Sequence, residues 1–297
     1  MYCGGQGVYL RYLAREFQRM GHEVDVLAGP PYPSLSEGVR LHKLESLNLY
    51  DLKDNSWART PFQVFNLLNL YEVVATTLGM FPEILTFGIR AYLKIRGLRD
   101  HFDIIHDNQS LGYGLLLTKT LGIPLVATIH HPLPLDRKAE LAQAENLWQK
   151  LGRMMFYPFF MQHIVSNRME MVITDSNSSA REIRNIFRVP ESKLRVIYPG
   201  VDTNIFRSGN SDTRERGSII VVGNTEDRKK GIIYLLKALQ LLKGDVSLKL
   251  IIVDQEANAK YATSLVREYG LEGMVSFTGR LSAEELARHY SASEIAV

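Results

Sequence analysis

The chain has 297 residues, of which 45% are hydrophobic, 23% are charged and 9% are aromatic, and its formal net charge is +3. This length and composition are typical of a globular protein with room for two domains, and they do not indicate a disordered chain. So small a charge gives no support to a nucleic-acid partner. A lone cysteine, Cys3, excludes an internal disulfide framework and agrees with a reducing cytoplasm.

The amino terminus combines a glycine cluster with a predicted amphipathic helix. Gly4 and Gly5 precede an apolar stripe that recurs at helical spacing through residues 9–20. Residues 24–28 then indicate a buried strand. A glycine-rich turn before a helix normally follows a strand, so we expect the first strand to be missing from this chain. A plain tight turn is the alternative. The chain shows no signal peptide pattern and no stretch of the roughly 18 apolar residues that a membrane span needs.

Two apolar regions are harder to interpret. Within residues 31–101, we expect a strand at 38–44 and one or two helices at 61–97, which core packing explains best. An acceptor-binding or membrane-facing role for these helices is the alternative. Residues 148–164 predict a buried helix kinked at Pro158, and their flanking arginines leave contact with a lipid surface open.

Two strand–helix units follow one another in the middle of the chain. We expect strands at 102–106 and 125–129, with a loop at 107–110 and a helix at 111–121 between them. Consecutive units of this kind predict parallel strands with right-handed crossovers.

Both of these strands lead into histidines. Because the carboxyl ends of parallel strands form the edge at which ligands bind, His130 is a candidate for substrate contact, with His131 as its neighbouring competitor. His106 is expected to bond a neighbouring carbonyl group instead. No carboxylate or cysteine falls at metal-ligand spacing around them, so we expect no metal site.

Two further predicted strands complete this half of the chain, at 171–174 and 194–198. Ser179 and Glu182 have the spacing of a capping box that starts a helix. Residues 199–202 predict a turn, and residues 208–217, which are polar, predict a linker.

A basic loop is the strongest pattern in the sequence. Residues 217–231 contain a short β-branched run and a polar loop, and apolar positions then recur at helical spacing from 232 to 242. Arg228, Lys229 and Lys230 stand just before this helix, where free N–H groups favour an anion. The pattern indicates a phosphate site, and three solvated cations are the alternative.

The remaining residues predict alternating strands and helices. Strands are expected at 248–253 and 275–278, and a helix at 261–269. Residues 282–285 form a capping box for one more helix, and residues 295–297 begin a last strand.

The basic loop and its helix resemble the start of the second domain in the retaining glycosyltransferases of family 4. The resemblance implies an α/β fold of GT-B architecture, in which two Rossmann-like domains with parallel sheets face each other across a cleft. It places an acceptor-side domain at 1–205 and a partial nucleotide-sugar-binding domain at 206–297. The family's paired-glutamate motif would follow residue 297, so we expect the second domain to be truncated.

The same resemblance assigns roles to particular residues. Lys230 matches the family lysine that holds the donor diphosphate. Asn224 stands where the family has an arginine, so Arg228 or Lys229 would have to replace that charge. His130 matches the histidine that contacts the donor sugar.

Glycines and one acidic residue complete the expected donor site. The resemblance places Gly4 and Gly5 near the donor diphosphate. It also places Gly200 and Asp202, in the predicted turn, at the domain boundary facing the donor.

The resemblance implies a metal-independent glycosyltransferase that needs no cofactor and moves a sugar, with retention, from a nucleotide-diphosphate sugar to an unknown glycan, lipid or small-molecule acceptor. His130 and Lys230 would carry the reaction. We expect a cytoplasmic protein, with contact at the inner face of the membrane left open. A non-catalytic fragment and a sugar-nucleotide epimerase are the alternatives; an oxidoreductase is disfavoured because the first glycines lack the dinucleotide-binding spacing.

Overall fold

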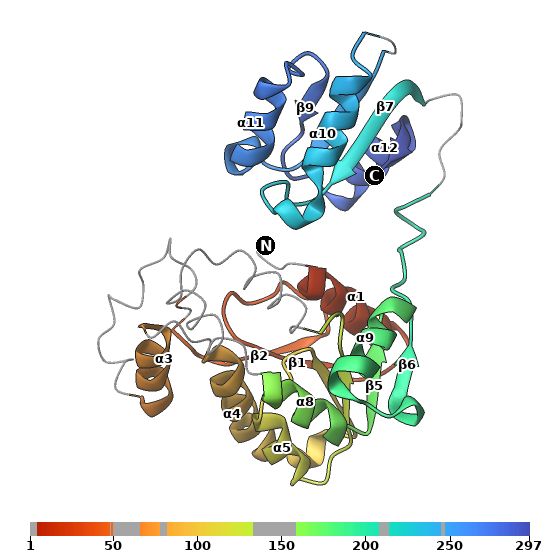
Figure 1. Cartoon of the computed structure of the whole chain (residues 1–297). Coiled ribbons are helices and arrows are strands. Elements are labelled where there is room, and N and C mark those ends of the chain that lie inside the picture. The colour runs from red at the N-terminus through yellow and green to blue at the C-terminus, as the bar shows by residue number, and fades with distance from the viewer. Residues whose placement is uncertain are drawn as a thin grey trace. The chain divides into compact units, whose positions relative to one another are not determined.

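The protein, described here by a computed structural model, separates into two compact units, Met1–Pro199 and Gly200–Val297. The structure describes residues 5–47, 49, 66–77, 82–132, 159–207, 214–244 and 247–297 (Figure 1). Every strand pair in these residues is parallel, and helices separate most of the strands along the chain. The predicted α/β class with parallel sheets is therefore confirmed.

The first unit contains two parallel sheets. One pairs β1 with β2, and the other has four strands in the order β3-β4-β5-β6. The elements in chain order are α1 (Gly5–Arg19), β1 (Asp25–Ala28), β2 (Arg40–Lys43), α3 (Leu67–Thr77), α4 (Glu83–Arg96), the 3-10 helix η2 (Arg99–His101), β3 (Ile105–Asn108), α5 (Gly114–Lys119), β4 (Leu125–Thr128), α8 (Phe159–Arg168), β5 (Met171–Thr174), α9 (Asn177–Phe187), the 3-10 helix η3 (Glu191–Lys193) and β6 (Leu194–Val196).

Helix α4 packs on both sheets of the first unit. Its Ala91 and Ile95 lie in one apolar cluster with Leu27 of β1 and Ile105 of β3. One helix thus covers apolar side chains from both sheets. The larger core of this unit lies around β4 and contains Leu125, which is fully buried.

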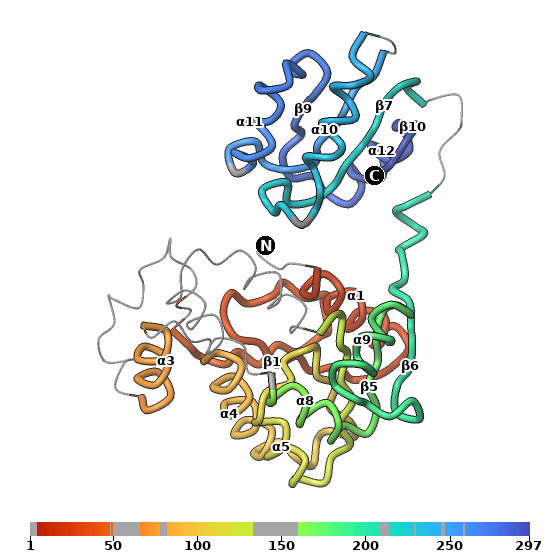
Figure 2. Tube along the Cα trace, viewed as in Figure 1, coloured from red at the N-terminus to blue at the C-terminus, as the bar shows by residue number. Residues whose placement is uncertain are grey.

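Helices α4 and α5 run side by side (Figure 2), and glycines permit their close approach. A Cβ atom added to Gly114 would collide with the backbone of Gly88, so neither helix can carry a larger residue there without moving. This contact fixes the position of the loop between β3 and α5.

The strand predicted at 102–106 is displaced, because the structure places β3 at Ile105–Asn108. Pairing begins only where Ile105 N donates a hydrogen bond to Pro124 O, directly before β4. Ile104 lies outside the sheet with 58% of its surface exposed. The displacement moves His106 from the last to the second position of the strand and puts Asn108 at its carboxyl end.

Two predicted helix starts are wrong. The helix expected at 111–121 is shorter, because Gln109 and Leu111 have positive φ angles of 60° and 45° that an α-helix cannot contain. The capping box expected at Ser179 does not form. Ser176 caps α9 instead, by accepting a hydrogen bond from Ser179 N at 3.1 Å.

The second unit is a four-stranded parallel sheet in the order β10-β7-β8-β9. The expected succession of strand, basic loop and helix is confirmed, as is the capping box of Ser282 and Glu285. The predicted linker ends earlier than residue 217, because β7 already begins at 215. The elements are β7 (Glu215–Val222), the 3-10 helix η5 (Arg228–Lys230), α10 (Ile232–Leu241), β8 (Lys249–Val253), the 3-10 helix η6 (Glu256–Asn258), α11 (Lys260–Glu268), β9 (Val275–Phe277), α12 (Ala283–Ala292) and β10 (Ser293–Ala296).

The apolar segment predicted at 148–164 is only partly described. Its first residues, through Pro158, lie outside the described ranges, and α8 begins at Phe159. None of the described helices combines the length and the apolar character that a membrane crossing requires.

A matched pair of leucines on α10 tests the packing of the second unit. Leu236 is fully buried and Leu241 is 81% exposed. We expect Leu236→Ala to lower the free energy of unfolding by about 2 to 5 kcal/mol, because it leaves a cavity in the core. Leu241→Ala should change it by less than about 0.5 kcal/mol. Urea titration of both variants of the full chain measures the difference, and equal losses would contradict the assigned burial.

Candidate functional site

The loop between β7 and α10 has the geometry of an anion site. Gly223 and Gly231 at its two ends have positive φ angles of 150° and 71°, which other residues rarely adopt. Gly231 is the N-cap of α10, and no described side chain caps this end of the helix. The first N–H groups of α10, at the positive end of the helix dipole, therefore remain available to an anion.

Hydrogen bonds to acidic side chains hold this loop in shape. Asp254, directly after β8, accepts bonds from Thr225 N at 2.7 Å and from Thr225 Oγ1 at 2.8 Å. Glu226 accepts a bond from Tyr261 N at 2.8 Å. Asn224 Oδ1 accepts a bond from Glu226 N at 3.1 Å, so its side chain shapes the turn. These carboxylates are engaged by loop and helix groups rather than by the loop's cations.

The loop presents two exposed cations. The Arg228 guanidinium stacks over the Tyr261 ring, 4.8 Å from its centroid, which restricts where this flexible side chain can lie. Lys230 is exposed and forms no ion pair with any described residue. The side chain of Lys229 lies outside the described atoms. Two positive charges thus remain available beside the free end of α10.

In the first unit, the carboxyl ends of three neighbouring strands meet at His130. Its Nδ1 lies 3.3 Å from Asp175 Oδ2, after β5, and its Nε2 lies 3.0 Å from Asn108 Oδ1, at the end of β3. Asn108 Nδ2 donates to the carbonyl of Gln6, which orients the amide. The Tyr9 ring of α1 meets the imidazole edge-on, with ring centroids 4.8 Å apart.

The backbone of His130 is held as firmly as its ring. His130 N donates to Gln109 Oε1 at 2.7 Å, and Ser179 Oγ donates to His130 O at 2.8 Å. Every polar group of His130 therefore has a protein partner, and its side chain is only 12% exposed. A substrate that binds a ring nitrogen must take the place of Asn108 or Asp175. His131 is exposed at the same edge.

The partners of His130 did not emerge from the sequence. Asn108, Gln109 and Asp175 follow predicted strands, and Tyr9 belongs to the apolar stripe at 9–20, but the sequence places none of them beside His130. That position at a strand end was the available signal, because it marks the ligand-binding edge of a parallel sheet.

Two titratable groups, the partly buried His106 and the buried Asp107, support this edge. His106 bonds Thr128 Oγ1 at 2.7 Å, not the carbonyl predicted from the sequence. Burial, and secondarily the neighbouring His130, lower the pKa of His106, which favours the neutral imidazole. Burial raises the pKa of Asp107, although hydrogen bonds from Ser110 and Leu111 oppose this effect.

The other predicted site residues have mixed outcomes. Gly4 lies outside the described residues. Gly5 begins α1, and a Cβ atom at Gly5 or at Gly200 would meet nothing within 4 Å, so packing in the described chain does not explain either glycine. The turn expected at 199–202 lies further along, because Asp202 O accepts hydrogen bonds from Ile205 N and Phe206 N.

The predicted site residues fall in both units. Gly5 and His130 belong to the first unit, whereas Gly200, Asp202, Asn224, Arg228 and Lys230 belong to the second. Within the described residues, no group of three or more histidine, cysteine, aspartate or glutamate side chains is placed to hold a metal ion.

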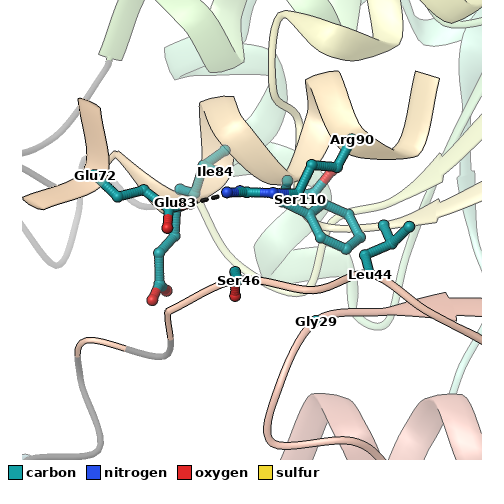
Figure 3. Close-up of a pocket in the computed structure, with 9 residues that line it drawn as sticks. Gly29, Leu44, Ser46, Glu72, Glu83, Ile84, Arg90 and Ser110 are labelled. Atoms are coloured by element: carbon teal, nitrogen blue, oxygen red, sulfur yellow. Dashed lines mark hydrogen bonds and ion pairs between the residues drawn. The ribbon is translucent and has the colours of Figure 1, made fainter. Parts of the chain in front are cut away.

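A cavity of about 210 Å³ lies at the carboxyl ends of β1, β2 and β3, beside α3 and α4 (Figure 3). Serine hydroxyls, apolar side chains and one ion pair form its wall. Within it, Arg90 Nη1 lies 2.5 Å from Glu72 Oε1, and both side chains are nearly buried. The lining residues are Gly29, Leu44, Ser46, Glu72, Glu83, Ile84, Phe87, Arg90 and Ser110.

Glu83 has the most perturbed carboxyl group of this cavity. Burial, and then repulsion by Glu72, raise the pKa of Glu83 from 4.5 to about 7, while the attraction of Arg90 lowers it by less. The two carboxyl groups compete for one arginine, and Glu72 holds it.

The comparison with known proteins gives matches along the whole chain. Residues 3–205 match the family described as Glycosyltransferase Family 4, and residues 202–297 match the family described as Glycosyl transferases group 1. The protein of Mycolicibacterium hassiacum named MMP alpha-(1->4)-mannosyltransferase is 38% identical over 297 residues, which cover 99% of this chain and 72% of that protein.

Solved structures with a similar fold include two at low sequence identity. Sucrose-phosphate synthase from Thermosynechococcus elongatus has a TM-score of 0.65 at 20% identity, over 99% of this chain and 69% of that one. Anabaena HepE in complex with UDP-glucose has a TM-score of 0.63 at 14% identity, over 99% and 70%. At these identities the likeness concerns the fold alone.

The shifted pKa of Glu83 makes the stability of the protein depend on pH. A carboxyl group whose folded-state pKa is raised binds protons more tightly when folded, so its contribution to stability falls as the pH rises from about 4.5 to about 7. Glu83→Gln should remove about 1 to 3 kcal/mol of this pH dependence, allowing for partial exposure. Urea unfolding at pH 5 and pH 7.5 measures it, and an unchanged pH slope would contradict the assignment.

Proposed function

Because the chain belongs to the group 1 glycosyltransferases of glycosyltransferase family 4 and has their GT-B fold, we propose that it transfers mannose from a nucleotide-diphosphate mannose to a sugar acceptor, forming an α-(1→4) linkage with retention. The 38% identical relative, by its name, supports the choice of mannose and of the linkage. Retention follows if the donor is α-linked, as nucleotide-diphosphate mannoses are, because the new bond is also α.

The cationic loop after β7 is the observation that carries this proposal. When the sugar leaves its donor, negative charge grows on the departing nucleoside diphosphate. Lys230, Arg228 and the first N–H groups of α10 can stabilise that charge, since Asp254 and Glu226 bond to Thr225 and Tyr261 instead. Preorganised charges of this kind usually supply the largest part of such catalysis. We propose that these groups act without a metal ion.

We propose that His130 contacts the donor sugar. The ring is already oriented by Asp175 and Tyr9, so it loses little freedom when a ligand binds. A sugar hydroxyl can replace Asn108 at Nε2, because a hydroxyl oxygen accepts a hydrogen bond as the amide oxygen does. His131, which is exposed beside it, is the alternative contact.

Product analysis tests the reaction itself. The full chain, incubated with GDP-mannose and methyl α-D-mannopyranoside, should form a disaccharide whose new bond is α-(1→4), as read from its NMR spectrum. A β-linked product would exclude retention. Release of an altered sugar nucleotide without acceptor would instead indicate an epimerase.

Substitution of two lysines distinguishes a specific role of the basic loop from a general effect of positive charge on donor binding. Lys230 stands just before α10, and Lys237 lies in the middle of this helix. We expect Lys230→Ala to weaken GDP-mannose binding about tenfold or more and to lower turnover about 100- to 1,000-fold, because it removes a charge facing the leaving group. Lys237→Ala, on the exposed face of α10, should change neither. Calorimetry of donor binding and initial rates measure both effects. A wild-type donor affinity in Lys230→Ala would refute the assignment of the loop.

A further inference from the structure

We propose that the cavity at the carboxyl ends of β1, β2 and β3 binds the acceptor and selects an uncharged sugar over a sugar that carries an anionic ester. This inference rests on the proposed function, because it presupposes an acceptor. The cavity lies wholly within the first unit. Neither its location nor its residues were identified from the sequence.

Arg90, the only arginine among the described residues that line the cavity, is not available to an anionic ligand. Arg90 Nη1 bonds Glu72 and Arg90 Nη2 bonds Asn69, each at 2.5 Å. The Arg90 and Glu72 side chains are only 11% and 2% exposed, and Thr86 donates a further hydrogen bond to Glu72. A phosphate or sulfate group that took Arg90 would leave the Glu72 carboxylate buried without its counter-charge, which is strongly unfavourable.

Glu83 adds a second obstacle to an anion. Its carboxyl group extends from α4 toward the segment that carries Ser46, and no described side chain bonds it (Figure 3). When Glu83 is ionised, the described residues that line the cavity carry two negative charges against one positive charge. An anionic ester would meet this charge at close range and in a partly buried site, where Coulomb repulsion is stronger than in water.

The same groups suit the hydroxyls and ring of a neutral sugar. The Glu83 carboxylate can accept hydrogen bonds from sugar hydroxyls, and the hydroxyls of Ser46 and Ser110 can both donate and accept. Phe87 and Ile84 offer apolar contact to the C–H groups of a sugar ring. The volume of about 210 Å³ is below the roughly 300 to 1,000 Å³ of sites for drug-sized ligands, so it suits a single sugar unit of the acceptor.

Binding measurements with two glycosides test this selectivity. Methyl α-D-mannopyranoside is neutral, and its 6-O-sulfate ester keeps one negative charge between pH 6 and pH 8. At pH 8, NMR titration of the full chain should show the neutral glycoside binding about tenfold or more tightly than the ester. Glu83→Gln keeps the shape and most hydrogen bonds but removes the charge, so it should narrow this ratio several-fold. Glu37→Gln, exposed in the same unit, should leave the ratio unchanged.

A second measurement needs no variant. Among the described residues, the charged and titratable groups around Glu83 are Glu72 on α3 and Arg90 on α4, and the serines add no charge. Because Glu83 takes up a proton below about pH 7, wild-type selectivity should be smaller at pH 6 than at pH 8.

Three results would overturn the proposal: equal affinities for the two glycosides at pH 8, no binding of the neutral glycoside, or a ratio that neither Glu83→Gln nor pH alters. GDP-mannose binding, measured by calorimetry on the same samples, separates these failures from a failure of the proposed function. If the donor binds and mannose is transferred, the enzyme assignment stands and the acceptor site lies elsewhere. If the donor does not bind, the proposed function fails first.

Discussion

Parallel strand pairing is the constraint on which both candidate sites depend. In a parallel sheet every strand ends at the same edge, so residues far apart in sequence meet there. His130 and Asp175 are 45 positions apart and come into contact because β4 and β5 are adjacent. Thr225 and Asp254 are 29 positions apart and bond because β7 and β8 are adjacent. The chemistry of each unit is therefore assembled by its sheet.

Hydrogen bonds to carboxylates then convert these edges into defined sites. In the second unit, Asp254 and Glu226 bond to backbone N–H groups, which shapes the basic loop without neutralising its cations. In the first unit, Asp107 bonds Leu111 N and holds a loop in which Gln109 and Leu111 have left-handed conformations. Asp254, Glu226 and Asp107 thus act on the backbone, and none of these three carboxylates neutralises Arg228 or Lys230.

The buried charges of the first unit have an energetic cost that suggests a role in binding. An ion pair such as that of Glu72 and Arg90 is costly to desolvate and is seldom more stabilising than an apolar pair of the same volume. Glu83 adds a carboxyl group that cannot ionise freely. Groups of this kind concentrate at functional sites, because there the cost in stability is offset by selectivity. We interpret the buried charges of the cavity beside α4 as groups whose cost in stability is offset by selectivity for a ligand.

The sequence by itself determined the kind of most strands and α-helices, and it identified the basic loop of the second unit as a candidate phosphate site. Hydrophobic periodicity, glycines and helix caps are patterns that extend over only a few residues. The local sequence therefore predicted β5, α10 and the Ser282 cap. The basic loop could be recognised for the same reason, because it lies within one continuous stretch of sequence. The family resemblance confirmed by the matches along the chain rests on those same stretches.

Only the tertiary structure decided where strands begin to pair, which residues surround His130 and where the cavity lies. The start of β3 depends on where β4 offers a partner, and the later start of α5 depends on the positive φ angles of Gln109 and Leu111 in the loop before it. The competition of Glu72 and Glu83 for Arg90 depends on the packing of α3 against α4. These are contacts between distant segments, and local sequence preferences carry no information about them, because they act only along the chain.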